Sequence, residues 1–345
     1  KVWQISNVQV EIDGKIVFVG SSNSYLIIIS TCKLRQEAGL VLRATGQGLS
    51  GWVAELEAAE SDFGLALGVF DGVHLGHRFV IDAARGCRRT GVLTFEPHPV
   101  QVLAPDRAPR RILATMEHKM QILDTLGVDF LVVIEFSREF ASGEARVFAD
   151  ELLGSGVRRL AAGEDWNFGK GRKGNMKHLA EWGDEVGVAV HAVSAVMQKG
   201  ERISSTRIRQ ALRDENLVAA EEMLGRPYSV MGEVVQGRQL GRQLGFPTAN
   251  VAVSDEQLPP NGVYVVQGRW EGQWIRGVAN IGTRPTVDKS MARSLEVNLF
   301  SDQVPDAYGW TLEMAFLRKI REERKFESVE ALKEQISRDV EEAKR

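Results

Sequence analysis

The sequence predicts two folded domains of different class, a parallel α/β domain followed by a small antiparallel β-barrel. From residue 64 to about residue 190, apolar strands alternate with amphipathic helices, which is the pattern of a parallel sheet covered by helices. From Tyr228 onward the pattern changes to short strands separated by Gly, Pro and Asn, as in a small barrel. A length of 345 residues accommodates two such domains.

The composition excludes several classes of protein. Hydrophobic residues make up 43% and charged residues 26% of the chain, as in globular proteins that bury a core. The net charge of −3 and the pI near 6.2 give no reason to expect a nucleic acid or an anionic membrane as partner. The longest apolar run, residues 25–29, is too short to span a bilayer, and no signal-peptide pattern is present. Because two cysteines, Cys32 and Cys87, fit a reducing compartment, we expect a cytoplasmic protein. We also expect it to be a monomer or a weak homo-oligomer.

The first sixty residues differ from the rest of the chain. Apolar and polar residues alternate over 8–12, Asp13-Gly14 is a two-residue turn signal, and a second strand is expected over 16–19. A third strand is expected over 25–29. No group of residues here indicates a chemical function. We therefore treat residues 1–60 as an N-terminal extension of unknown role.

The α/β pattern predicts its elements in chain order. The expected strands are residues 65–69, 92–95, 130–134, 159–162 and 188–193. Helices are expected from Gly76 and over 115–126 and 144–153. In such sheets, ligands bind at the carboxyl ends of the strands. The motifs described below follow several of these strands.

The carboxyl-terminal part predicts a barrel closed by a helix. The expected strands are residues 228–235, 262–268, 274–281, 294–300 and 310–317. Helices are expected up to Arg213, over 217–224 and over 328–345, and Gly225-Arg226-Pro227 ends the second of them. The predicted organisation is an extension over 1–60, an α/β domain over 61–213, a linker over 214–227 and a barrel domain over 228–345.

One candidate site follows the first strand of the α/β domain, within Gly64–His77. A strand, a glycine-bearing loop and a helix aim backbone N–H groups and the positive end of the helix at one point, where a phosphate binds favourably. Gly72 and Gly76 would let phosphates approach the backbone, and His74 and His77 could donate hydrogen bonds to a phosphoryl group. Two other interpretations stay open. The histidines could lie at the surface without a function, or bind a metal, although no Cys, His or Asp cluster nearby completes a shell.

Two further stretches combine hydroxyl groups, glycines and arginines. Residues 203–209, with the sequence ISSTRIR, either cap a helix or, with the neighbouring Arg202, form a phosphate-binding patch. Residues 245–250, with the sequence GFPTAN, suit a loop that surrounds phosphates. Thr248 and Asn250 offer hard oxygen ligands appropriate to Mg²⁺. A glycine-rich corner of a barrel is the alternative.

Nine motifs follow one another along roughly residues 62–341. They are GVFDGVHLGH (68–77), TFEPHP (94–99), GEDWNFGKGRKG (163–174), RISSTRIR (202–209), LGRQLGFPTANV (240–251), NGVYVV (261–266), GVANIGTRPTV (277–287), SLEVNLF (294–300) and RKIREERKF (318–326). With these motifs the chain resembles the bacterial bifunctional riboflavin kinase/FMN adenylyltransferases, also called prokaryotic FAD synthetases.

The resemblance implies a fold and two reactions. The α/β domain would be a Rossmann-like nucleotidyltransferase domain, and the barrel would be a six-stranded kinase domain with a C-terminal helix. The barrel would transfer the γ-phosphoryl group of ATP to riboflavin, giving FMN, with Mg²⁺ as cofactor. The α/β domain would join AMP from a second ATP to FMN, giving FAD and pyrophosphate.

The resemblance also implies roles for individual residues. In adenylyl transfer, His74 and His77 would stabilise charge on the α-phosphate. The other residues that would bind this ATP are Gly68, Phe70, Asp71, Gly72, Gly76, Asp165, Arg202, Ser205, Thr206 and Arg209. In the kinase half, Glu296 would be the general base and Thr248 and Asn250 would bind Mg²⁺. The residues that would bind ATP there are Gly241, Arg242, Gly245, Pro247, Thr248 and Asn250, and those that would bind flavin are Asn280, Arg284 and Arg321.

One departure from the family pattern lies close to the expected base. Asn298 stands where family members often have histidine, two residues after Glu296 and on the same face of the strand. It leaves two alternatives beside the bifunctional enzyme, an FMN adenylyltransferase with an impaired kinase half and a non-catalytic flavin-binding regulatory protein. The presence of Glu296 argues against the second alternative, because a protein that only binds flavin needs no base.

Overall fold

The chain forms two compact units. A computed structural model describes residues 62–236, 245–270, 272–285, 291–301 and 308–345, together with the backbone of three strands within 9–29. For residues 284, 285, 291 and 292 only the backbone is described. The first unit comprises Lys1–Arg110 and Lys119–Arg202, and the second unit comprises Arg111–His118 and Ile203–Arg345. The domain boundaries near residues 60, 213 and 228 stay predictions.

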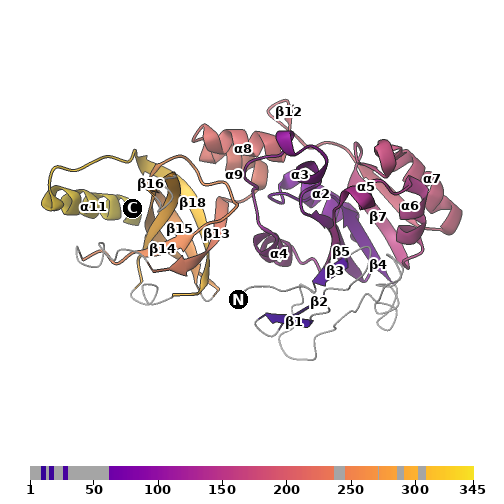
Figure 1. The fold of residues 1–345 in the computed structure, drawn as a ribbon, viewed down its shortest axis with the longest axis horizontal. Coiled ribbons are helices and arrows are strands. Elements are labelled where there is room, and N and C mark those ends of the chain that lie inside the picture. The colour runs from indigo at the N-terminus through magenta and orange to yellow at the C-terminus, as the bar shows by residue number, and fades with distance from the viewer. Residues whose placement is uncertain are drawn as a thin grey trace. The chain divides into compact units, whose positions relative to one another are not determined.

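The first unit is built on an eight-stranded sheet with the order β1-β2-β3-β6-β5-β4-β7-β10 (Figure 1). Its strands are β1 (Gln9–Ile12), β2 (Lys15–Phe18), β3 (Leu26–Ile29), β4 (Phe63–Leu67), β5 (Arg89–Glu96), β6 (Phe130–Glu135), β7 (Val157–Gly163) and β10 (Ala189–Val193). The strands β6, β5, β4, β7 and β10 pair in parallel. The predicted parallel α/β sheet is therefore confirmed.

Three strands of the N-terminal extension join this sheet. Strands β1 and β2 form an antiparallel hairpin in which Ile12 pairs with Lys15, as the predicted two-residue turn requires. The turn residues 13 and 14 themselves lie outside the described residues. Strand β3 then pairs antiparallel with β6. The extension thus contributes backbone to one edge of the sheet, and its role stays unknown.

Helices accompany the strands of the first sheet. They are α2 (Leu75–Ala83), α3 (Pro99–Leu103), α4 (Met116–Thr125), α5 (Arg138–Ala141), α6 (Ala145–Leu153) and α7 (Met176–Val186), with the short 3₁₀ helices η2 (Pro105–Arg107) and η3 (Lys170–Arg172). Apolar residues of α6 and α7 pack against those of β4 to β7 in one buried cluster. Two short hairpins complete the unit, β8 (Asn167–Phe168) with β9 (Gly174–Asn175) and β11 (Met197–Gln198) with β12 (Glu201–Arg202).

The second unit contains a closed barrel with the strand order β13-β14-β17-β16-β15-β18. Its strands are β13 (Tyr228–Val235), β14 (Ala249–Ala252), β15 (Gly262–Trp270), β16 (Gln273–Pro285), β17 (Met291–Leu299) and β18 (Thr311–Arg321). All neighbours pair antiparallel. The six-stranded barrel implied by the resemblance is confirmed. The sequence pattern does not predict strand β14, because only Ala249 and Val251 mark its buried face.

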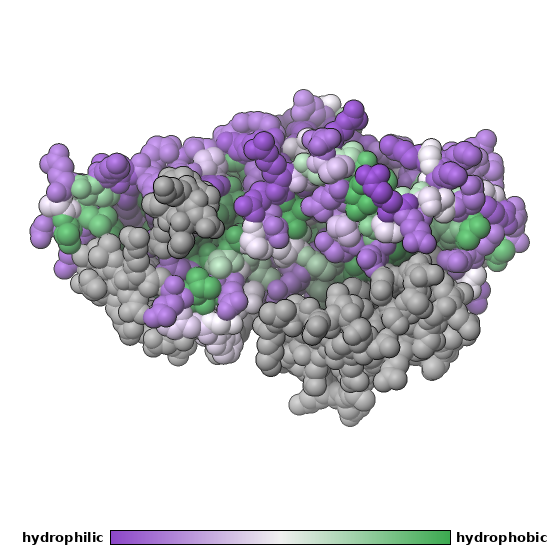
Figure 2. Space-filling view, viewed as in Figure 1, coloured by the Kyte–Doolittle hydropathy of each residue, from purple (hydrophilic) through white to green (hydrophobic). Residues whose placement is uncertain are grey.

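Two helices precede the barrel strands in the sequence, and a third follows them. They are α8 (Ser205–Arg213), α9 (Leu217–Leu224) and α11 (Val329–Lys344). Helix α11 begins after Ser328, whose hydroxyl accepts a hydrogen bond from the N–H of Ala331, and it packs against β16 (Figure 1). This is the predicted C-terminal helix. Within the described ranges, no helix is both long and apolar enough to cross a membrane. Hydrophilic residues cover most of the coloured surface in Figure 2.

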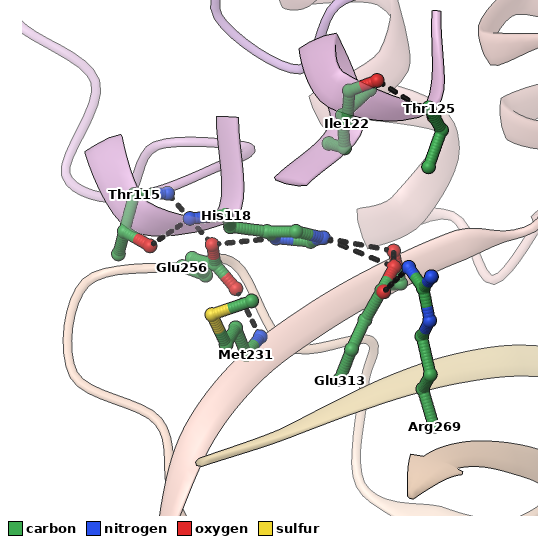
Figure 3. A network of polar contacts seen from close by, with 9 residues as sticks. Thr115, His118, Ile122, Thr125, Met231, Glu256, Arg269 and Glu313 are labelled. Atoms are coloured by element: carbon green, nitrogen blue, oxygen red, sulfur yellow. Dashed lines mark hydrogen bonds and ion pairs between the residues drawn. The ribbon is translucent and has the colours of Figure 1, made fainter. Parts of the chain in front are cut away.

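A buried histidine ties the segment Arg111–His118 to the barrel of the same unit (Figure 3). The Nδ1 atom of His118 lies 2.8 Å from the carboxylate of Glu256, and its Nε2 atom lies 3.3 Å from that of Glu313. The hydroxyl of Ser229 lies 3.1 Å from Nε2 and donates to Glu313 over 2.9 Å. Because each ring nitrogen faces a carboxylate, the doubly protonated imidazolium is the form that satisfies both contacts.

The two glutamates are themselves held in place. The carboxylate of Glu256 accepts hydrogen bonds from the backbone N–H groups of Thr115 and Met231 at 2.7 and 2.6 Å. Burial alone lowers the pKa of His118, but the hydrogen bonds to Glu256 and Glu313 outweigh it, so the pKa of His118 is raised. The histidine therefore stabilises the second unit in its charged form.

We expect His118→Gln to lower the free energy of unfolding by about 3 kcal/mol, because it leaves the buried Glu256 carboxylate without its cation and leaves Glu313 only the longer ion pair with Arg269 at 3.8 Å. A raised folded-state pKa gives a stabilisation that is complete below about pH 6.5 and is lost as pH rises through the raised value. The wild-type unfolding temperature should therefore fall over this pH range, and that of His118→Gln should change less. Scanning calorimetry from pH 6 to pH 9 measures both. Equal pH dependence in the two proteins would contradict the assignment of charge to His118.

Candidate active sites

The connection between β4 and α2 has an unusual backbone. Phe70, Gly72 and Val73 adopt the left-handed region with φ values of 52°, 78° and 42°. This region suits glycine but costs a valine or phenylalanine roughly 1–3 kcal/mol. Phe70 and Val73 are both fully buried, and their packing holds the backbone in this conformation. The chain thus turns sharply out of the sheet and begins a helix at once.

The two predicted glycines have different physical roles. Gly72 allows the left-handed turn. A side chain at Gly76, in contrast, would place its Cβ atom about 3.1 Å from the ring of His74. Gly76 therefore makes room for an imidazole ring, a role that the prediction of close phosphate approach did not include.

His74 and His77 cap the first turn of α2 reciprocally. The N–H of His77 donates to Nδ1 of His74, and the N–H of His74 donates to Nδ1 of His77, both over 3.3 Å. The two rings stack with their centroids 3.6 Å apart. Because each Nδ1 accepts a hydrogen bond, the proton of each neutral ring lies on Nε2. Each histidine therefore presents a donor nitrogen at the positive end of a helix, as a phosphate site requires.

Asp165 and Arg202, two predicted nucleotide-binding residues, come together in the first unit. The guanidinium of Arg202 donates to both carboxylate oxygens of Asp165, at 2.6 and 3.0 Å. The hydrogen bond to Arg202 holds the pKa of Asp165 below its usual range. Both side chains are more than half exposed, so the pair adds little stability. Its main effect is to orient two side chains that the family resemblance predicts to bind the same ATP.

Ser205 and Thr206 begin α8, and Arg209 lies one turn further along it, in the second unit. The residue that caps this helix is Ser204, whose hydroxyl accepts the N–H of Arg207 at 3.2 Å. The capping role that the sequence left open thus belongs to Ser204. Arg209 is 8% exposed, and its Nε atom donates to the backbone carbonyl of Arg111 over 2.9 Å. Its direction is therefore fixed by the protein.

In the barrel, the predicted kinase residues form one row across neighbouring strands. Asn250 on β14 pairs with Glu296 on β17, and Glu296 pairs with Asn280 on β16. The row continues through Val263 on β15 to Arg321 on β18. Residues directly opposite in antiparallel strands point to the same face. Four predicted residues from four strands thus share one face of the barrel.

This face is the outer one. Leu295 and Val297, which flank Glu296, are 1% exposed and belong to the barrel interior, whereas Glu296 and Asn298 are half-buried. The amide of Asn298 donates to the backbone carbonyl of Pro247 over 2.6 Å. Asn298 therefore anchors the residue that precedes Thr248 instead of acting at the base.

Asn250 has a feature expected of a ligand-binding residue. Its side-chain oxygen is buried and, among the described residues, has no hydrogen-bond partner. A buried acceptor left without a donor is costly, and a cation or a ligand donor removes that cost. The described residues contain no group of three or more His, Cys, Asp or Glu side chains that could bind a metal.

Other predicted kinase residues have different settings. Gly245, Pro247 and Thr248 lie just before β14, whereas Gly241 and Arg242 lie outside the described residues. Arg284 belongs to β16, and only its backbone is described. Arg321 binds the buried carboxylate of Asp339 on α11, with its Nη2 atom 2.7 Å from the nearer oxygen. Arg321 thus attaches the C-terminal helix to the barrel, a contact that the sequence did not predict.

We expect Asn298→Ala to weaken ATP binding in the barrel. The substitution removes the hydrogen bond to Pro247 and loosens the segment that carries Thr248, and one hydrogen bond is worth about 1 kcal/mol. Steady-state assays of any ATP-dependent reaction of the barrel should show a KM for ATP raised about fivefold. An unchanged KM would mean that this contact does not position Thr248.

Comparison with known proteins gives consistent results for both halves. The FAD synthetase family model matches residues 56–207, and the riboflavin kinase family model matches residues 224–345. Proteins described as bifunctional riboflavin kinase/FMN adenylyltransferase are 42% identical in Escherichia coli and 38% identical in Bacillus subtilis. These matches cover 80% and 81% of this chain and 90% of each relative. A crystal structure described as a macrolide-efflux protein from Streptococcus pneumoniae has a TM-score of 0.71 and 32% identity, and the match covers 82% of this chain and 94% of that one.

Proposed function

The chain belongs to the family of bifunctional riboflavin kinase/FMN adenylyltransferases, and we propose that each reaction takes place at one of the two candidate sites. The protein phosphorylates riboflavin with ATP to FMN and then adenylylates FMN with ATP to FAD and pyrophosphate. The pneumococcal structure is described as an efflux protein, but both family models and the bacterial relatives name flavin chemistry. The observation that carries the assignment of sites is the row of Asn250, Glu296 and Asn280 on the barrel.

In the kinase half, Glu296 acts as the general base. The riboflavin hydroxyl oxygen attacks the γ-phosphorus of ATP, its proton passes to the Glu296 carboxylate, and ADP leaves. Asn280, Arg284 and Arg321 bind the flavin. Gly241, Arg242, Gly245, Pro247, Thr248 and Asn250 bind ATP. The position of Glu296 beside Asn250 and Asn280 supports this arrangement, because it places a carboxylate between a phosphate-side and a flavin-side residue.

Magnesium is the proposed cofactor of this half. The buried oxygen of Asn250 fits such an ion, since Mg²⁺ prefers oxygen ligands and keeps several of them from substrate phosphates. Thr248 and Asn250 would hold it. When bound, the ion neutralises charge on the phosphates of ATP.

In the adenylyl-transfer half, the protein positions two anions and needs no nucleophile of its own. A phosphate oxygen of FMN attacks the α-phosphorus of ATP, and the bond to the leaving pyrophosphate breaks. The Nε2–H groups of His74 and His77 donate to the α-phosphate as its charge grows. The other residues that bind this ATP are Gly68, Phe70, Asp71, Gly72, Gly76, Asp165, Arg202, Ser205, Thr206 and Arg209.

Supplying riboflavin and FMN separately tests this assignment. Each is incubated with ATP and Mg²⁺, and the flavins are separated by chromatography. We expect FAD from both, and chelation of Mg²⁺ should stop FMN formation from riboflavin. FAD from FMN alone would indicate an impaired kinase half, and flavin binding without either product would indicate a regulatory protein. The cytoplasmic location and the monomeric or weakly oligomeric state of the protein stay predictions.

A further inference from the structure

A buried lysine lies behind the connection between β4 and α2. Lys119, on α4, is 4% exposed, and its ammonium group donates to the backbone carbonyl of Val69 over 2.9 Å. It also lies 3.4 Å from the hydroxyl of Thr94, which itself donates to the same carbonyl over 2.9 Å. Lys119, Val69 and Thr94 all belong to the first unit. Two donors thus fix the last carbonyl before the left-handed residues begin.

The burial of this ammonium group requires an explanation. Lysine is almost never fully buried unless it is paired, because removing a charge from water is costly. Burial lowers the pKa of Lys119, while the charges of Asp71 and Glu96 oppose this effect. Asp71 is 4% exposed and follows Phe70 in the connection, and Glu96 ends β5. The ammonium group therefore lies where two acidic side chains, Asp71 in the phosphate-facing loop and Glu96, favour its charged form.

We propose that Lys119 is a positioning residue for adenylyl transfer, which holds the loop from Val69 to His74 in place through the carbonyl of Val69. The proposal depends on the proposed function of that loop. Phe70 and Val73 hold conformations that cost free energy, so they persist only where their surroundings fix the backbone. The carbonyl bound by Lys119 lies immediately before them. Small displacements of a positioned catalytic group lower the reaction rate strongly. Loss of the anchor at Val69 should therefore displace His74 and His77 and slow adenylyl transfer.

The charge of Lys119 should also affect the binding of ATP, apart from its effect on the loop. Without the ammonium group, a positive charge is lost from behind the loop that faces the triphosphate of ATP, while the acidic side chains of Asp71 and Glu96 remain in the same region. The KM for ATP in adenylyl transfer should then rise, in addition to a fall in kcat. The kinase reaction takes place on the barrel and uses none of these residues. It therefore reports on the same protein sample as an internal control.

The first test is Lys119→Met, which keeps most of the aliphatic side chain and removes the charge. We expect kcat/KM for ATP in the conversion of FMN to FAD to fall between tenfold and a hundredfold, and the rate of riboflavin phosphorylation to stay unchanged. Lys177→Met is the matched control, because Lys177 lies on α7 of the same unit and its side chain is 82% exposed. It should leave both rates unchanged. An unchanged adenylyl transfer in Lys119→Met, or an equal fall in both reactions, would overturn the proposal.

The second test uses the wild-type protein and distinguishes positioning from a purely structural role. An exposed lysine loses its proton near pH 10.4. Because the pKa of Lys119 is lowered, its ammonium group loses the proton at a lower pH, and adenylyl transfer should decline as the pH rises through that lower value. The ratio of adenylyl transfer to kinase activity, measured from pH 7 to about pH 10.4, should fall, and Lys119→Met should lack this decline. A constant ratio in the wild type overturns the proposal even if the variant fails to fold. A wild-type protein that makes no FAD from FMN would instead refute the proposed function itself.

Discussion

Glu296→Gln should reduce the formation of FMN from riboflavin by about a hundredfold to ten-thousandfold, the usual contribution of a general base. Glutamine keeps the shape of the side chain and its place between Asn250 and Asn280, but it cannot take the proton of the riboflavin hydroxyl. Conversion of supplied FMN to FAD should continue at the wild-type rate. Chromatography of the flavins formed from each substrate measures both reactions in one sample.

A matched control separates the base from a general effect of charge on the barrel. Glu233 lies on β13 of the same barrel and is exposed. Glu233→Gln should leave both reactions unchanged. FMN formation at the wild-type rate in Glu296→Gln would show that Glu296 is not the base.

His74→Asn should reduce the conversion of FMN to FAD by about a hundredfold to a thousandfold, while riboflavin phosphorylation continues. The substitution is chosen because His74 has two roles. Its Nδ1 atom caps α2 by accepting the N–H of His77, and its Nε2–H is the group that we propose donates to the α-phosphate. Asparagine is a good capping residue, so it preserves the first role and removes the imidazole.

Comparison with His74→Ala divides the two roles. Alanine removes both the cap and the imidazole, and losing a cap costs about 1 kcal/mol of stability. We expect the two variants to lose adenylyl transfer to a similar extent and only His74→Ala to lose stability in thermal unfolding. Wild-type activity in His74→Asn would mean that the histidine acts only as a cap.

Local patterns predicted most of the fold. The sequence predicts the barrel strands, such as β13, and the apolar strands β4 and β6 directly. It does so because the pattern of apolar residues within each strand reflects whether one or both of its faces are buried. Helix α7 was missed, although its limits carry local signals. Asn175 caps its start, and Gly187 ends it with a φ of 77°. Both are recognised signals at helix ends.

Contacts between distant segments could not be predicted in this way. The motifs indicated Glu296 and Asn250 separately, but only strand pairing across the barrel places them side by side. His118 and Lys119 are adjacent in one helical segment, yet they contact different units, His118 through Glu256 and Lys119 through Val69. Neither residue belongs to a motif. Nothing in the sequence of an amphipathic helix marks which of its charged residues is buried, because tertiary packing decides which positions lie inside the protein.

We assign the two reactions to separable sites in one chain, and mixing two variants, each impaired in one reaction, tests this assignment most directly. Glu296→Gln alone should leave riboflavin unconverted, and His74→Asn alone should convert riboflavin and accumulate FMN. A mixture of the two proteins with riboflavin, ATP and Mg²⁺ should produce FAD, because FMN released by one variant is the substrate of the other. A mixture that forms no FAD, although each protein keeps its remaining single reaction, would contradict the assignment of the reactions to two independent sites.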